Sequence, residues 1–187
     1  GAGPAYLPLV HGGGWVPRAG GGRQPAARLE SSGVRAGHTL AALGAWNRSF
    51  PGSTKWPIAC AGQSGGAKRA SYLAPLLAAA GYRVTGIFLE GINEEKLTGG
   101  YRRFNPGRGF LRTPIFLSSG LYDPIATLTQ QTAVRDSMRR AGFKNIRHET
   151  FNNDHVVMPA QVRTANRWFQ KTEVRKGKHC APTAGVK

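Results

Sequence analysis

Short apolar runs alternate with helix-like segments along most of this chain, and that alternation restricts its fold more than any other feature. The clearest runs are "WPIACAG" at 56–62, "YRVTGIFLEG" at 82–91 and "TPIFLSSG" at 113–120. Strands separated by helices in this way are typical of βαβ units, in which neighbouring strands run parallel. We predict strands at 6–10, 56–62, 82–91, 113–120 and 145–151, and helices at 68–81, 127–142 and 158–172. The sequence therefore predicts an α/β fold with a mainly parallel sheet flanked by helices.

The chain length suits one domain with a hydrophobic core of its own. It has 187 residues and a mass of 20.0 kDa, which lies within the usual size of a single domain. We expect that domain to cover 1–175 and a basic C-terminal tail to cover 176–187. The region 16–55 is rich in Gly, Arg and Ala and has poor periodicity. Within it, 25–33 is a candidate helix, and 38–46 fits a strand or a helix.

The chain is strongly basic, with a net charge of +17 and a sequence pI of about 11.1. Such a charge favours anionic partners, including nucleic acid. The basic residues are dispersed, however, and lack the aromatic interleaving of a single-strand binder. We therefore interpret the charge as general surface character, with nucleic-acid binding as the lesser alternative. No apolar run approaches the ~20 residues of a membrane span.

The two cysteines point to neither a disulfide scaffold nor a metal site. Cys60 lies in an apolar strand, where we expect a small core residue, and Cys180 lies in the tail. Cysteine usage does not identify the compartment; a secreted or periplasmic location is slightly favoured over a cytoplasmic one. The chain also lacks the usual zinc-protease and dinucleotide-binding motifs, so we expect neither a cofactor nor a metal.

The turn "GQSGG" at 62–66 follows a predicted strand and precedes a predicted helix. It matches G-x-S-x-G, a pattern that places a serine on a sharp, strained strand-to-helix turn. Gly62 and Gly66 would be small because strand and helix pass close together there. The pattern alone is also compatible with an ordinary glycine-rich turn or with an anion-binding helix N-terminus. As a nucleophile, Ser64 would need a base and a carboxylate that orients the base.

Candidates for both partners follow later strands. Asp123 lies in "GLYDPIA", directly after the predicted strand 113–120, and His155 lies in "FNNDHVV", between the last strand and the last helix. Loops at the carboxyl ends of parallel strands meet at one edge of the sheet. Asp154 is the alternative acid, although it adjoins the base, and Asp136 lies within a helix among arginines, where a surface ion pair is expected.

The chain resembles the α/β-hydrolases in "HGGGW" (11–15), "GQSGG" (62–66), "PIFLSSGLYDPIAT" (114–127) and "NNDHVV" (152–157). The likeness covers roughly residues 5–170. It implies that Ser64 is the nucleophile, His155 the general base and Asp123 the orienting acid. It also implies an oxyanion hole formed by a backbone N–H of Gly12 or Gly13 with that of Gly65. A full-size hydrolase has further strands before the first strand predicted here.

The resemblance implies a carboxylic-ester hydrolase that forms an acyl-enzyme on small or polymeric esters. Ser64 and Asp123 are only 59 positions apart, which leaves little room for a cap domain, so we expect an open, shallow pocket. Trp15, Gln63 and Tyr122 would line it. Amide or thioester hydrolysis remains an alternative, as does a catalytically silent protein that binds an anionic partner. The oligomeric state is left open.

Overall fold

The computed structural model describes residues 7–11 and 25–178, and within them five strands form one parallel sheet. The spatial order is β1-β2-β3-β4-β5, the same as the order in the chain. The strands are β1 (Leu7–His11), β2 (Ile58–Gln63), β3 (Val84–Glu90), β4 (Ile115–Gly120) and β5 (Ile146–Phe151). All four neighbouring pairs are parallel. The predicted α/β fold with a parallel sheet is therefore confirmed.

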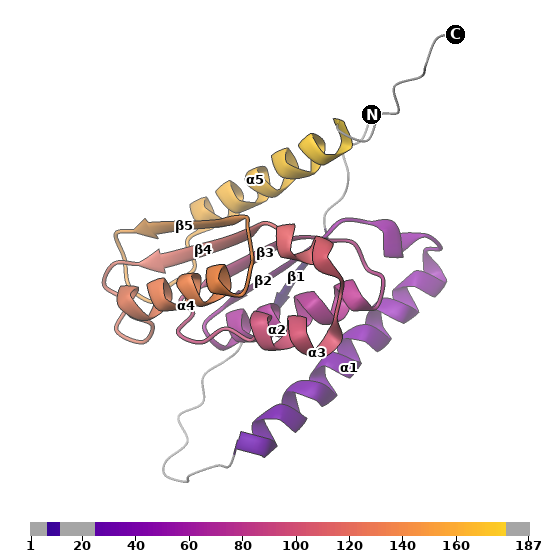
Figure 1. Cartoon of the computed structure of the whole chain (residues 1–187), viewed down its shortest axis with the longest axis horizontal. Helices are drawn as coiled ribbons and strands as arrows, with labels where there is room; N and C mark the ends of the chain where they lie inside the picture. The colour runs from indigo at the N-terminus through magenta and orange to yellow at the C-terminus, as the bar shows by residue number, and fades with distance from the viewer. Residues whose placement is uncertain (1–6, 12–24, 179–187) are drawn as a thin grey trace.

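Helices cover both faces of this sheet. They are α1 (Pro25–Ser49), α2 (Gly65–Ala79), α3 (Leu97–Phe104), α4 (Leu128–Arg140) and α5 (Pro159–Lys178), with 3-10 turns at Ser53–Lys55 and Arg108–Arg112. Figure 1 shows α2, α3 and α4 on one face of the sheet and α5 on the other, with α1 outside α2 and α3. Because all the strand pairs are parallel, the carboxyl ends of the five strands lie at one edge of the sheet.

Each face of the sheet has its own hydrophobic cluster, because side chains alternate along a strand. Ile87, Leu89, Ile115 and Leu117 belong to the large cluster that also includes the buried residues of α2. Phe88 and Phe116 alternate with them and pack against Ala165 and Phe169 of α5. This two-sided burial explains the continuous apolar runs of β3 and β4, which are typical of strands that are covered on both faces.

The structure resolves the ambiguous N-terminal region in favour of a helix. The segment 38–46, for which the sequence allowed a strand or a helix, lies within α1 together with 25–33. The sequence analysis missed α3 altogether. Its two glycines disfavour a helix, but one of them permits close packing, since a methyl at Gly100 would lie 2.7 Å from Pro75 Cγ of α2.

Two further expectations concern the C-terminal part of the chain and its relation to membranes. The last helix continues to Lys178, three residues into the segment expected to be a tail, and Cys180 lies outside the described residues. Cys60 is buried and free, as expected, and burial raises the pKa of its thiol to about 12. Among the helices that the structure describes, none is both long and apolar enough to cross a bilayer.

Candidate active site

Ser64 occupies a strained turn between β2 and α2. Its backbone has φ 53° and ψ −120°, which an L-residue adopts only when its surroundings require it. A methyl at Gly62 would lie 2.2 Å from the carbonyl carbon of Gly66, so strand and helix approach too closely for any side chain there. The Ser64 N–H also donates to the Glu90 carbonyl at 2.8 Å. The predicted sharp turn is confirmed, and its serine lies at the carboxyl edge of the sheet.

Asp123 and His155 are joined directly at the same edge. His155 Nδ1 lies 2.7 Å from Asp123 Oδ2. The other carboxylate oxygen, Oδ1, accepts the N–H groups of Ile125 and Ala126, each at 2.8 Å. The carboxylate is therefore buried and held from both sides. Because a carboxylate accepts, Nδ1 carries a proton, and in the neutral form of the ring Nε2 has a free lone pair.

The histidine loop packs closely against the ends of two strands. A methyl at Gly91, directly after β3, would lie 2.7 Å from His155 Cε1, and one at Gly120, at the end of β4, would lie 2.2 Å from the Asp154 carbonyl oxygen. Gln63 Nε2 donates to the His155 carbonyl at 2.8 Å. His155 Nε2 is buried and makes no hydrogen bond with any residue that the structure describes. The ring is thus fixed in place, and its Nε2 atom has no hydrogen-bond partner among the described residues.

The other residues predicted for the site have different surroundings. Gln63, expected to contact substrate, uses its amide nitrogen to hold the His155 loop. Gly65 begins α2 with open space at its Cβ position, and Tyr122 is 70% exposed in the loop that carries Asp123. Gly12, Gly13 and Trp15 lie outside the described residues. The alternative acid, Asp154, is exposed, and the carboxyl that contacts His155 belongs to Asp123.

Sequence analysis missed Glu90, the last residue of β3. It is 1% exposed, and desolvation raises its pKa from 4.5 to about 7, opposed by hydrogen bonds from Met158 and Ser118. Its only sequence signal is a carboxylate that ends an otherwise apolar strand run, at the edge where Ser64 and His155 also lie.

Among the described residues, no group of three His, Cys, Asp or Glu side chains is arranged to hold a metal ion.

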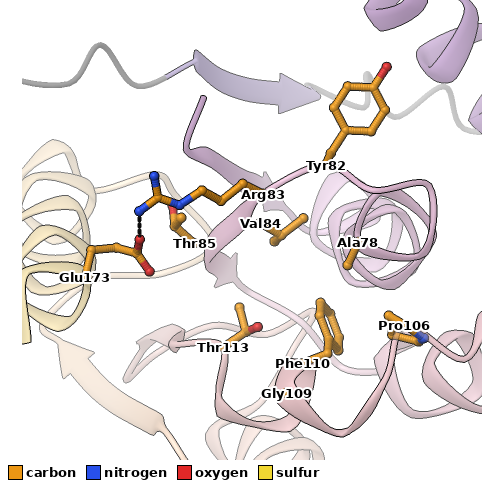
Figure 2. A pocket seen from close by; sticks show the side chains of 10 residues that line it. All are labelled: Ala78, Tyr82, Arg83, Val84, Thr85, Pro106, Gly109, Phe110, Thr113 and Glu173. Carbon is orange, nitrogen blue, oxygen red and sulfur yellow. Dashed lines mark hydrogen bonds and ion pairs between the residues drawn. The ribbon is translucent and has the colours of Figure 1, made fainter. Parts of the chain in front are cut away.

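A separate cavity of about 510 Å³ lies at the opposite edge of the sheet. Figure 2 shows its lining around the amino ends of β3 and β4, with Val84 and Thr113 on the side of Phe110 and Thr85 beside Arg83. Arg83 and Glu173 form an ion pair at its border. This hollow contains none of the residues gathered around Ser64, so the chemically distinctive groups and the large cavity occupy different ends of the strands.

Comparison with known proteins identifies the fold. No protein-family profile matches the chain, and no curated protein matches its sequence. Among solved structures, an acyl-protein thioesterase 2 from Zea mays matches with a TM-score of 0.57 and 18% identity, over 76% of this chain and 64% of that one. A carboxylesterase from Bacillus cereus gives 0.53 and 19%, over 76% and 62%. Esterase PE8 gives 0.53 and 18%, over 78% and 64%.

These similarities establish an α/β-hydrolase fold. At such low identity the likeness concerns the arrangement of the strands and helices, and what those proteins act on is a property of theirs. The chain also spans less than two thirds of the length of each of these three structures.

Proposed function

We propose that the protein is a serine hydrolase that cleaves carboxylic esters through an acyl-enzyme. The observation that carries the proposal is the 2.7 Å contact between His155 Nδ1 and Asp123 Oδ2, at the same sheet edge as a serine in a strained strand-to-helix turn. A nucleophile, a base and a buried carboxylate that fixes the base are the three groups that acyl transfer requires. The likeness to esterases and a thioesterase in fold gives further support.

In the proposed reaction, Ser64 Oγ attacks the ester carbonyl carbon while its proton passes to His155 Nε2. Asp123 stabilises the imidazolium that results, through the hydrogen bond at Nδ1. The oxyanion accepts the Gly65 N–H and, by the resemblance in sequence, one from Gly12 or Gly13; each such donor contributes about 3 kcal/mol in enzymes of this kind. The proton returns from Nε2 to the departing alkoxide, which leaves as the alcohol. Water then attacks the acyl-serine with the same base and releases the acid.

No hydrogen bond joins Ser64 to His155 within the residues that the structure describes, although the His155 nitrogen that would receive the proton is free and buried. Catalytic hydrogen bonds are often long until the substrate binds, so this geometry is compatible with the proposed proton transfer.

Exposed apolar side chains lie in two loops at this edge of the sheet, and they favour a substrate with an apolar group on one side of the ester. They belong to the loops that carry Asp123 and His155: Leu121, Tyr122, Ile125, Val156 and Val157. Clustered apolar exposure is typical of surfaces that bind ligands or partners. We therefore expect better turnover of esters with an apolar acyl group than of acetate esters.

The second candidate function is binding of an anionic partner by a catalytically silent chain. The net charge of +17 favours it, because such a surface attracts polyanions strongly at low salt. The strained serine and the buried Asp123–His155 pair favour the hydrolase, since binding through surface charge requires neither.

Hydrolysis of p-nitrophenyl acetate, butyrate and octanoate tests the proposal. We expect turnover by the wild-type protein and a loss of several orders of magnitude in Ser64→Ala. Ser49→Ala is the matched control, because Ser49 is exposed at the end of α1, and it should keep full activity. Equal rates for wild type and Ser64→Ala would contradict the proposal.

A further inference from the structure

Glu90 is a buried carboxyl group that the proposed reaction does not use, and it contacts all three segments that carry the candidate triad. Its backbone oxygen accepts the Ser64 N–H at 2.8 Å. Its Oε1 accepts the Met158 N–H at 3.1 Å, three residues after His155, and lies 3.4 Å from Ser118 Oγ on the strand that leads to Asp123. A single residue at the end of β3 therefore touches the nucleophile turn, the acid strand and the histidine loop.

Gly91, the residue after Glu90, brings β3 into direct contact with the His155 ring. Gly91 has φ +55°, and its Cα lies so close to the His155 ring that a methyl there would be 2.7 Å from Cε1. Its N–H donates to the Ser118 carbonyl at 3.2 Å. The ring thus rests on Gly91, while the loop behind the ring is tied to the Glu90 side chain. Movement of β3 relative to the histidine loop would disturb both contacts.

We propose that Glu90 is a positioning residue, which holds the histidine loop at Met158 so that His155 keeps its place between Asp123 and the Ser64 turn. The proposal deepens the function proposed above and rests on it. Glu90 touches neither substrate nor a reacting atom, and it acts through the backbone of the loop that carries the base.

The chemistry of the contact explains why an oxygen acceptor occupies this position. Met158 directly precedes α5, and its N–H points to Glu90 at the end of the helix where the dipole favours an acceptor with negative charge. A carboxyl oxygen can accept this N–H whether the group is ionised or protonated. A side chain of the same size without an acceptor would leave the partly buried Met158 N–H without a partner, and the loop would relax away from it.

Two substitutions of similar size separate positioning from bulk. Glu90→Gln keeps an oxygen acceptor for the Met158 N–H, whereas Glu90→Met has none. We expect Glu90→Met to lower kcat for p-nitrophenyl butyrate by about 10- to 100-fold with little change in KM, because small displacements of a catalytic group reduce the rate by such factors. Glu90→Gln should keep most of the wild-type kcat. Glu149→Gln, in the edge strand β5, is the control and should match the wild type.

Equal kcat values for Glu90→Met and wild type, with both proteins folded, would overturn the proposal. Amide hydrogen exchange in the wild-type protein needs no activity, so it tests the proposal even if Glu90→Met does not fold or the wild type is inactive. The Met158 N–H should exchange much more slowly than that of its neighbour Val157, and equal exchange rates would overturn the proposal even if Glu90→Met does not fold. An inactive wild type with a protected Met158 N–H would reject the esterase function and retain the role of Glu90 in holding the loop.

Discussion

The two edges of the parallel sheet differ in their chemistry. The amino edge has the large cavity, and the charged groups at its border, Arg83 and Glu173, form an ion pair with each other. The carboxyl edge has a serine with positive φ, a buried carboxylate bonded to a histidine, and two buried polar atoms, Glu90 Oε2 and His155 Nε2, that make no hydrogen bond with the described residues.

This difference indicates where the fold carries its function. Strained backbone and unsatisfied buried polar atoms destabilise a protein, so they persist where they serve a purpose. The described residues that line the hollow at the amino edge include no unsatisfied buried side-chain atom, and the positive φ of Asn105 beside it is a conformation that asparagine adopts readily. In an open α/β sheet the loops after the carboxyl ends of the strands form the ligand site, and here that edge has the unusual backbone, burial and hydrogen bonding.

Among the variants that follow, the largest effect should come from changing the proposed acid. Asp123→Asn preserves the shape of the side chain but favours the wrong histidine tautomer, which lowers kcat by about 10⁴-fold in serine proteases. We expect a loss of similar size in ester hydrolysis here. Asp154→Asn is the matched control, since Asp154 is exposed, and it should stay within a few-fold of wild type. A larger loss in Asp154→Asn than in Asp123→Asn would reverse the assignment.

Gly62→Ala tests whether the turn at Ser64 needs its close backbone approach. The new methyl would lie 2.2 Å from the backbone of Gly66, and overpacking of this kind costs about 3 kcal/mol of unfolding free energy. Gly99→Ala in α3 adds a methyl with no atom within 4 Å and should stabilise the helix by up to about 1 kcal/mol. Urea denaturation of the two variants measures the contrast, and an unchanged midpoint for Gly62→Ala would disprove the close approach.

Glu90 should make stability depend on pH. Burial raises its pKa from 4.5 to about 7, so the folded protein keeps the proton over a pH range in which the unfolded chain has lost it. The folded state then binds more protons, and the free energy of unfolding falls as the pH rises from 4.5 to 7, by about 3 kcal/mol. Glu90→Gln should remove this contribution. Urea denaturation at several pH values would contradict the account if both proteins gave parallel profiles.

The smallest effect is expected at the amino edge. Arg83→Gln breaks the ion pair with Glu173, but the Arg83 side chain is 54% exposed, and exposed pairs contribute at most about 1 kcal/mol. Thermal unfolding should shift by a few degrees or less, and ester hydrolysis should not change. A large loss of hydrolysis in this variant would show that the cavity in Figure 2 takes part in the reaction.

Most of the sheet could be predicted because its strands are apolar runs with clear boundaries. The positions of Ser64, Asp123 and His155 at one edge follow from the same pattern, since each comes after a strand that is parallel to the others. The direct contact between Asp123 and His155 could not be derived in this way. It depends on the path of two loops, which Gly91 and Gly120 permit by lacking side chains.

The parts that sequence analysis missed depend on contacts between distant segments. The α3 sequence "LTGGYRRF" has weak helix propensity, and its helix forms against α2. Glu90 ends an apolar strand like many surface carboxylates, and only the packing of α5 and the histidine loop over it makes it a buried acid. Local composition contains no information on either contact.

The central claim is that Ser64 is an activated nucleophile, and labelling with a fluorophosphonate tests it most directly. Mass spectrometry after incubation should find one adduct per wild-type chain, located on Ser64, and none on folded Ser64→Ala. Asp123→Asn should label much more slowly than wild type. A folded wild-type protein that acquires no adduct, or acquires the same adduct as Ser64→Ala, would contradict the account.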